Sequence, residues 1–282
     1  MQTKYIFLDI DGTLFDHNTP KVPESTKLAI KKAKENGHKV FICTGRSYRD
    51  IPLKIKEIAV DGYIYGVGAH IVIDKQTVFK NCFPIPLALK TFEYLIENDL
   101  GFKIDCVDAI HAFLESGHNF IQYMLDTDEE EVIEKTSHLL NHHYYLNESI
   151  IDLVRHDEFE YLKITAFDKD KTKMDKILSQ LTNDFDYYIS PLANTGIYFS
   201  ELKLKDVSKA NGIKRVLEYY HADKKDSLAI GDSLNDLDMI EYVNTGIAMG
   251  NGCKALKEKA DYITANLEDD GIYQAFKHFK LI

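Results

Sequence analysis

Two aspartates near the start of the chain have types and spacing that could support chemistry. Asp9 and Asp11 follow the apolar run Tyr5–Leu8, which is typical of a short strand buried on both faces. Residues i and i+2 of an extended chain lie on the same side, so we expect the two carboxylates to start close together at the carboxyl end of this strand. Open α/β sheets bind ligands there. Carboxylates held close repel each other unless a cation lies between them or one is protonated, so Mg²⁺, which takes oxygen ligands, is the first candidate.

The alternative interpretation of these aspartates is an ordinary surface turn. Asp-Gly is a common turn signal, and Gly12 allows a tight departure of the backbone. The apolar run before Asp9 favours a functional site, because an exposed turn rarely follows a fully buried strand. A calcium-binding EF-hand loop is excluded, because it requires Gly at its sixth position and Gly12 comes too soon after Asp9.

Polar residues of complementary types follow two further short apolar runs. Thr44-Gly45-Arg46 follows Lys39–Cys43, and Gly231-Asp232-Ser233-Leu234-Asn235-Asp236 follows Ser227–Ile230. If these runs are parallel strands of one sheet, their carboxyl ends meet at the same edge as the first aspartate pair.

These strand ends could together form a phosphate site with a metal. Asp232 can complete a metal site with Asp9, and Thr44 with its neighbouring backbone N–H groups can bind phosphate oxygens. Such a site also needs a positive charge, and Lys209, near the start of a predicted helix, is the best candidate.

The elements that would position these residues form strand–helix–strand units, which favour a parallel sheet with right-handed crossovers. The patterns predict strands over 5–8, 39–43, 62–66, 70–74, 227–230 and 245–249, and helices over 24–36, 47–58, 207–221 and 269–280. We therefore predict an α/β, Rossmann-like parallel-sheet core formed from both ends of the chain, over residues 1–83 and 190–282.

The character of the sequence changes at Pro84 and returns near Ser190. The intervening segment is long enough for an α+β layer of its own. Its patterns predict helices near 87–98, 129–142 and 171–182, and strands near 102–107, 110–115, 161–167 and 185–190. We therefore predict an inserted α+β domain over residues 84–189.

Composition limits the possible partners of the chain. Its 282 residues carry a net charge of −11, which argues against nucleic acid or an anionic membrane as the main partner. Four widely spaced cysteines and the absence of a long apolar run are typical of a reduced, cytoplasmic protein, and a strand this close to Met1 leaves no room for a signal peptide. No pattern indicates a particular oligomeric state.

The motifs Asp9–Leu14, Thr44–Arg46, Val207–Lys209 and Gly231–Asp236 occur in an order that resembles the haloacid dehalogenase superfamily of phosphohydrolases, and closely its Cof-type subfamily. The resemblance covers the whole chain. It implies Mg²⁺ as cofactor, a small phosphorylated metabolite as partner, and a C2-type α+β cap over 84–189 that goes with substrates such as sugar phosphates.

The resemblance also implies roles for individual residues. Asp9 would be the nucleophile that forms an aspartyl-phosphate, and Asp11 the general acid and then the base. Asp9, Asp11 (through its backbone carbonyl) and Asp232 would bind the metal. The remaining residues would bind or orient the phosphoryl group and the substrate: Lys209, Thr44, Gly45, Arg46, Asn235 and Asp236. These side chains suit phosphoryl transfer, because it depends on a nucleophile, positioning and charge stabilisation.

One departure and two alternatives accompany this interpretation. Many Cof-type relatives carry Asn-Gly-Ala where this chain has Val67-Gly68-Ala69, so a substrate contact made by that Asn is absent. The expected function is a Mg²⁺-dependent phosphatase. The alternatives are a phosphosugar mutase on the same scaffold, which would need a bisphosphate activator, and a catalytically silent protein that binds a phosphorylated metabolite.

Overall fold

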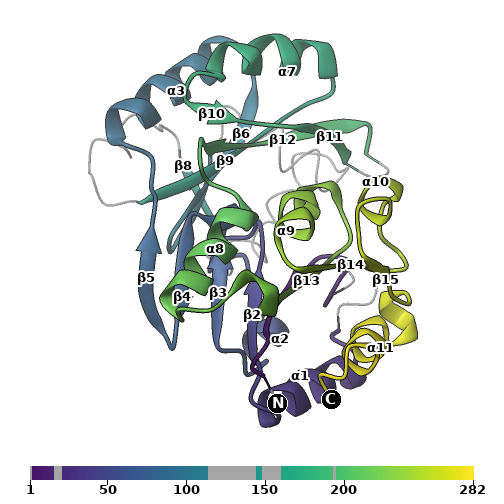
Figure 1. Cartoon of the computed structure of the whole chain (residues 1–282). Coiled ribbons are helices and arrows are strands. Elements are labelled where there is room, and N and C mark those ends of the chain that lie inside the picture. Colours follow the sequence, from purple (N-terminus) through teal and green to yellow (C-terminus); the bar gives the residue numbers. More distant parts are fainter. Residues whose placement is uncertain (1, 16–20, 114–143, 148–159, 193–194) are drawn as a thin grey trace. The chain divides into compact units, whose positions relative to one another are not determined.

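The computed structural model describes residues 2–15, 21–113, 144–147, 160–192 and 195–282. Two compact units make up the chain (Figure 1): the first comprises Met1–Gly45, Ile51–Lys80 and Val207–Ile282, and the second comprises Arg46–Asp50 and Asn81–Asp206. The predicted helix over 129–142 lies outside the described residues.

The first unit is built on an eight-stranded sheet with the order β15-β14-β13-β1-β2-β3-β4-β5. The neighbours from β15 to β3 pair in parallel, and β4 and β5 add an antiparallel edge. The strands are β1 (Tyr5–Leu8), β2 (Lys39–Cys43), β3 (Gly62–Tyr65), β4 (His70–Ile73), β5 (Gln76–Lys80), β13 (Ser227–Gly231), β14 (Thr245–Ala248) and β15 (Tyr262–Ile263).

Helices cover both faces of this sheet, because alternate residues of its central strands face opposite sides. Ile6 and Leu8 of β1 pack in one apolar cluster with α1 and α11, whereas Phe7 packs in another with α8 and α9. The helices are α1 (Glu24–Glu35), α2 (Leu53–Lys56), α8 (Lys209–Tyr219), α9 (Leu237–Tyr242), α10 (Lys254–Lys257) and α11 (Gly271–His278). The prediction of an α/β core is confirmed.

The prediction of a helix over residues 47–58 is wrong for most of that range. The only helix there is α2, which begins after Pro52, and residues 48–50 form a turn. A proline disfavours the helical conformation of the residue before it, so the helix begins after Pro52 rather than before it.

The second unit contains a sheet with the order β10-β12-β9-β6-β7-β8, in which β11 also pairs with β12. Its strands are β6 (Gly101–Cys106), β7 (Ile110–Phe113), β8 (Tyr144–Asn147), β9 (Tyr161–Asp168), β10 (Phe185–Asp186), β11 (Ile189–Leu192) and β12 (Ile197–Leu204). Helices α3 (Ile85–Glu97) and α7 (Lys171–Leu178) pack with apolar residues of β6 and β9 in one cluster.

The second unit ends later than the sequence patterns predicted. The return to the core was expected near residue 190, but β11 pairs antiparallel with β12, and this unit extends to Asp206. The strand predicted over 185–190 is divided into β10 and β11.

No helix in the described part of the chain is long and apolar enough to cross a bilayer.

Candidate active site

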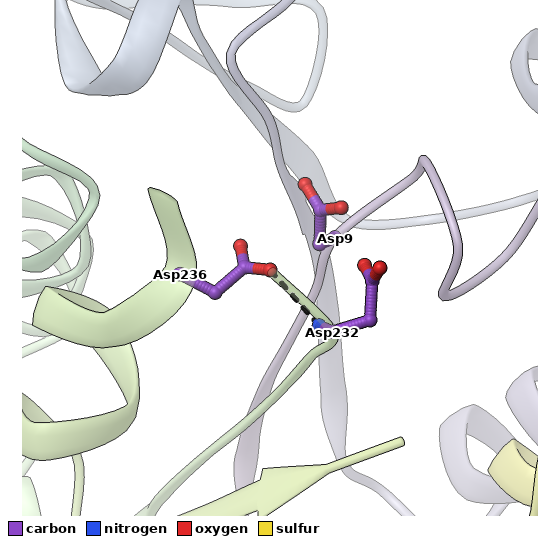
Figure 2. A group of neighbouring side chains, drawn as sticks. All are labelled: Asp9, Asp232 and Asp236. Atoms are coloured by element: carbon purple, nitrogen blue, oxygen red, sulfur yellow. Dashed lines mark hydrogen bonds between the residues drawn. The ribbon is translucent and has the colours of Figure 1, made fainter. Parts of the chain in front are cut away.

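Sheet register brings together two of the strand ends that the sequence predicts to carry chemistry. Strand β1 pairs with β13 at Leu8 and Ile230, and the Asp9 backbone N–H donates to the Ile230 carbonyl oxygen at 3.0 Å. Asp232 follows the end of β13 directly. Asp9, Asp232 and Asp236 each offer one carboxylate oxygen within 4.8 Å of the others, and Figure 2 shows the three side chains together. This edge therefore offers a set of hard oxygen ligands.

Gly12 shapes the turn that leaves β1. Its φ of +77° lies in the left-handed region, and a Cβ atom at this position would overlap the Asp232 carboxylate. The next residue, Thr13, donates from Oγ1 to Asp232 Oδ1 at 3.3 Å. The Asp-Gly-Thr sequence thus turns the chain and lets the loop approach Asp232 closely.

We expect Gly12→Ala to lower the phosphatase activity that the sequence resemblance implies at least tenfold, because the new methyl group must displace the Asp232 carboxylate and the left-handed backbone is strained for alanine. Steady-state rates of phosphate release measure the effect. Gly37→Ala is the matched control: Gly37 has φ +85°, but a Cβ atom there would meet nothing within 4 Å, so this variant tests backbone strain alone. Equal rates for the Gly12 variant and this control would contradict the assigned overlap.

Lys209 is the buried cation of the site. Ser208 caps helix α8 by accepting from the Asn211 backbone N–H at 3.1 Å, and Lys209 is the first residue of that helix. Lys209 Nζ lies 2.6 Å from Asp9 Oδ1 and 2.5 Å from Asp236 Oδ1, and its side chain is fully buried. The predicted positive charge is therefore in contact with the predicted nucleophile.

Asp236 is held by hydrogen bonds through both of its oxygens. While Oδ1 accepts from Lys209, Oδ2 accepts from the backbone N–H groups of Asp232 and Ser233 at 2.9 and 3.0 Å. Asp9 and Asp232 are therefore better suited as direct metal ligands, and Asp236 is suited to hold Lys209 and the loop after β13.

Electrostatics at this edge favour a bound cation. Burial, together with Asp236, raises the pKa of Asp9 well above its ordinary value despite the nearby Lys209, and burial and Asp236 raise the pKa of Asp232 to about 7. Burial alone would lower the pKa of Lys209, but Asp236 and Asp9 raise it well above the ordinary value, so the lysine stays charged. A divalent cation between Asp9 and Asp232 would favour the ionised form of both carboxylates and so lower both pKa values.

The other predicted residues differ in where the structure places them. Asp11 lies half-buried in the turn after β1, close enough to raise the pKa of Asp9. Thr44 is buried directly after β2, the other neighbour of β1 in the sheet, and Gly45 follows it. Asn235 is half-buried in the loop after β13 and accepts from Ser233 Oγ at 2.6 Å.

Arg46 follows Gly45 directly in the sequence. It belongs to the second unit, where its guanidinium donates to the Asp50 carbonyl oxygen at 2.8 Å and forms an ion pair with the Asp50 carboxylate at 3.3 Å. A contact between Arg46 and substrate therefore stays a prediction.

The loop after β14 supports the site, although the sequence patterns gave it no role. Asn251 donates from Nδ2 to the Gly12 carbonyl oxygen at 2.8 Å and accepts from the Leu267 backbone N–H at 2.9 Å. The Cys253 backbone N–H donates to the Asp232 carbonyl oxygen at 2.7 Å. The signal available in the sequence was Gly250-Asn251-Gly252 at a further strand end, but only the sheet order shows that β14 is next to β13.

Comparison with known proteins connects this site to a family. Residues 6–276 match the family model for haloacid dehalogenase-like hydrolases. The chain is 31% identical over the full length of both proteins to a Bacillus subtilis (strain 168) protein named "Putative phosphatase YkrA". It is 25% identical to 5-amino-6-(5-phospho-D-ribitylamino)uracil phosphatase YitU of the same organism, over 99% of each chain.

Solved structures show the same fold. A haloacid dehalogenase-like hydrolase from B. subtilis superposes with a TM-score of 0.81 at 22% identity, over 98% of this chain and 99% of that one. The subclass IIB sugar phosphatase BT4131 superposes with a TM-score of 0.78 at 25% identity, over 99% of this chain and 100% of that one. The chain therefore belongs to the haloacid dehalogenase-like hydrolases and is a phosphatase of their Cof-type branch.

Proposed function

We propose that this phosphatase is a Mg²⁺-dependent hydrolase of a small phosphomonoester, a sugar phosphate or a related polyol phosphate, and that it acts through an aspartyl-phosphate. The observation that carries the proposal is the contact of Asp9 with buried Lys209 at the sheet edge that also presents Asp232. A nucleophilic carboxylate, a fixed cation and a hard-metal ligand set are the parts that phosphoryl transfer needs.

The residues divide the reaction into two steps. In the first, an Asp9 carboxylate oxygen attacks phosphorus, the bond from phosphorus to the leaving oxygen breaks, and Asp11 gives that oxygen its proton. In the second, Asp11 takes a proton from water, the water oxygen attacks phosphorus, and the Asp9–phosphorus bond breaks to release inorganic phosphate. Lys209, held by Asp236, offsets the negative charge on the phosphoryl oxygens throughout.

The donor set fits Mg²⁺. Asp9 and Asp232, with the backbone carbonyl of Asp11, would hold the ion through oxygen atoms, and the absent side chain of Gly12 leaves space beside Asp232. When bound, the ion supplies charge neutralisation and orients the phosphate. Thr44 and the backbone near Gly45 would bind the remaining phosphoryl oxygens.

Exhaustive chelation with EDTA is expected to stop phosphate release, and added Mg²⁺ is expected to restore it. Ca²⁺ should restore much less, because its larger and looser ligand shell disturbs in-line geometry. Release of inorganic phosphate from p-nitrophenyl phosphate, assayed without a bisphosphate activator, measures the effect and also separates a phosphatase from a mutase. Full activity in the chelated enzyme would refute the metal dependence.

We further propose that the second unit is the inserted domain that selects the substrate. Its own sheet and apolar cluster are consistent with a separate domain. The relatives support a polyhydroxylated substrate, since BT4131 is described as a sugar phosphatase and YitU is named for a phosphoribityl compound.

We also propose a cytoplasmic location. The four cysteines form no disulfide, which is consistent with a reduced, cytoplasmic location.

A further inference from the structure

The first turn of helix α8 decides where Lys209 can lie. Lys209 is the first residue of that helix, and its ammonium group contacts Asp9 and Asp236. Its side chain is fully buried among close-packed atoms, so it has little freedom to compensate for a displaced backbone. A shift of the backbone at Lys209 would therefore move the cation relative to the predicted nucleophile. All of these residues belong to the first unit.

The carboxylate of Asp238 ties this turn to helix α9. Asp238 is the second residue of α9, and its Oδ2 accepts from the Ala210 backbone N–H at 3.1 Å. Its Oδ1 accepts from the Met239 backbone N–H at 2.8 Å, which fixes the orientation of the carboxylate. The first N–H groups of a helix have no partner within it, and a carboxylate is a strong acceptor for them. Because Ala210 follows Lys209 directly, this bond holds the backbone next to the cation.

The turn Gly66–Gly68, which follows β3, contacts the same part of α8 through backbone atoms. A Cβ atom at Gly68 would lie 2.1 Å from the carbonyl oxygen of Ser208, the residue before Lys209. A Cβ atom at Gly212, within α8, would lie 3.2 Å from the Gly68 Cα atom. Glycine at both positions therefore lets the turn and the start of the helix approach more closely than side chains would allow.

The same turn is bonded to the strand end that carries Thr44. The Val67 backbone N–H donates to the Thr44 carbonyl oxygen at 3.1 Å, and the Thr44 backbone N–H donates to the Ile64 carbonyl oxygen at 2.9 Å. The turn therefore connects the end of β2, with a predicted phosphate ligand, to the helix that carries Lys209. Phosphoryl transfer depends on such fixed positions of the groups around phosphorus.

Stability alone does not explain this contact. Val67 is buried and has φ +59° and ψ +25°, in the left-handed region. This conformation is unfavourable for a β-branched residue and persists only where the surrounding structure enforces it. Gly212 lies inside α8, where glycine is less favourable than alanine. The chain thus loses stability at two residues of one contact, and such losses are typical of places where function requires a particular geometry.

We propose that Asp238 and Gly68 are positioning residues, which hold the first turn of α8 so that Lys209 meets the phosphoryl group in the transition state. The inference rests on the proposed phosphatase function. It also assigns a role to Val67-Gly68-Ala69, where the sequence departs from many Cof-type relatives: this turn acts through its backbone, by spacing α8 from the end of β2.

Gly68→Ala tests the contact with the turn, because the new methyl group must displace the Ser208 carbonyl and with it the start of α8. With Mg²⁺ and p-nitrophenyl phosphate, kcat should fall roughly tenfold or more while KM changes less than about threefold, since Lys209 acts mainly in the transition state. Gly37→Ala is the matched control: Gly37 also has a positive φ, but nothing lies within 4 Å of the added Cβ atom, so kcat should stay near the parent's value. An unchanged kcat in folded Gly68→Ala would overturn the inference.

Two substitutions of Asp238 separate positioning from packing, and they decide the question even if Gly68→Ala does not fold. Asp238→Ala removes the acceptor for the Ala210 N–H, so kcat should fall roughly tenfold. The amide oxygen of Asp238→Asn can still accept from that N–H, so this variant should keep at least about a third of the parent's kcat. Equal kcat values for the two folded variants would overturn the inference.

Unfolding by denaturant in EDTA tests the inference without any activity. If Gly68→Ala displaces Lys209, it has already weakened the ion pairs with Asp9 and Asp236. The loss of unfolding free energy caused by Lys209→Met should then be at least about halved in the Gly68→Ala background, or in Asp238→Ala if Gly68→Ala does not fold. Equal losses in both backgrounds would overturn the inference. If the losses differ but the parent releases no phosphate, the proposed function fails while the positioning of Lys209 stands.

Discussion

The Asp9→Asn variant is expected to lose phosphate release by roughly a thousandfold or more while keeping its fold. Asparagine is nearly the same size as aspartate, but its amide is a poor nucleophile and a poor metal ligand. Because Lys209 keeps its ion pair with Asp236 in this variant, the cation of the site is not left unpaired. The measurement is release of inorganic phosphate with saturating Mg²⁺.

The same substitution makes a second prediction, about stability. Burial raises the pKa of Asp9 above its value in the unfolded chain, so its ionised form disfavours folding at neutral pH in the absence of metal. The variant should therefore melt in EDTA at a temperature no lower than the parent. Asp175→Asn, on an exposed face of α7, is the control for the substitution itself.

The activity prediction for Asp9→Asn has its own contradicting outcome. A few per cent of residual activity, with deamidation excluded by mass spectrometry, would rule out Asp9 as the nucleophile.

The first unit could be predicted well because its signals are local. Each buried parallel strand is a short apolar run followed at once by polar residues, as at Leu8 and Asp9 or Gly231 and Asp232. Because parallel strands run in the same direction, their carboxyl ends lie at the same edge of the sheet. Asp9 and Asp232 could be placed together for this reason.

The second unit was harder to delimit, because antiparallel strands carry a weaker signal. Strand β12 mixes apolar with polar and charged residues and lacks a continuous apolar run, so its pairing with β11 could not be recognised from sequence. The return to the core was therefore expected too early. The ion pair between Asp105 of β6 and Lys163 of β9 depends on the register of the two strands, which sequence patterns alone do not fix.

Positioning contacts within the site were also beyond sequence reasoning. Lys209 was selected as the cation because it lies near the start of a predicted helix. Its contacts with Asp9 and Asp236, however, join residues that are 200 and 27 positions from it in the sequence. Asn251 likewise reaches Gly12 across the sheet. Such contacts follow from strand order, which becomes visible only in three dimensions.

Lys209→Met should abolish detectable turnover and also destabilise the protein without metal. Methionine keeps the unbranched length of lysine but removes the charge that faces Asp9 and Asp236. Because the carboxylates raise the pKa of Lys209, its stabilising contribution is complete at neutral pH, below the ordinary pKa of lysine. Breaking a buried ion pair from one side costs about 3–5 kcal/mol, so we expect a loss of this size in the free energy of unfolding in EDTA.

Magnesium and a double variant distinguish this effect from a simple packing defect. Mg²⁺ should stabilise Lys209→Met more than it stabilises the parent, because the ion replaces part of the missing positive charge near Asp9. Lys209→Met with Asp236→Asn removes both charges of one pair, while the amide oxygen can still accept from the backbone N–H groups of Asp232 and Ser233, and should recover stability but no activity. Denaturant unfolding with EDTA and with Mg²⁺ measures both effects. If Lys209→Met in EDTA were as stable as the parent, the buried lysine would not offset the repulsion between the two carboxylates, and its assigned role at the phosphoryl group would lose its electrostatic basis.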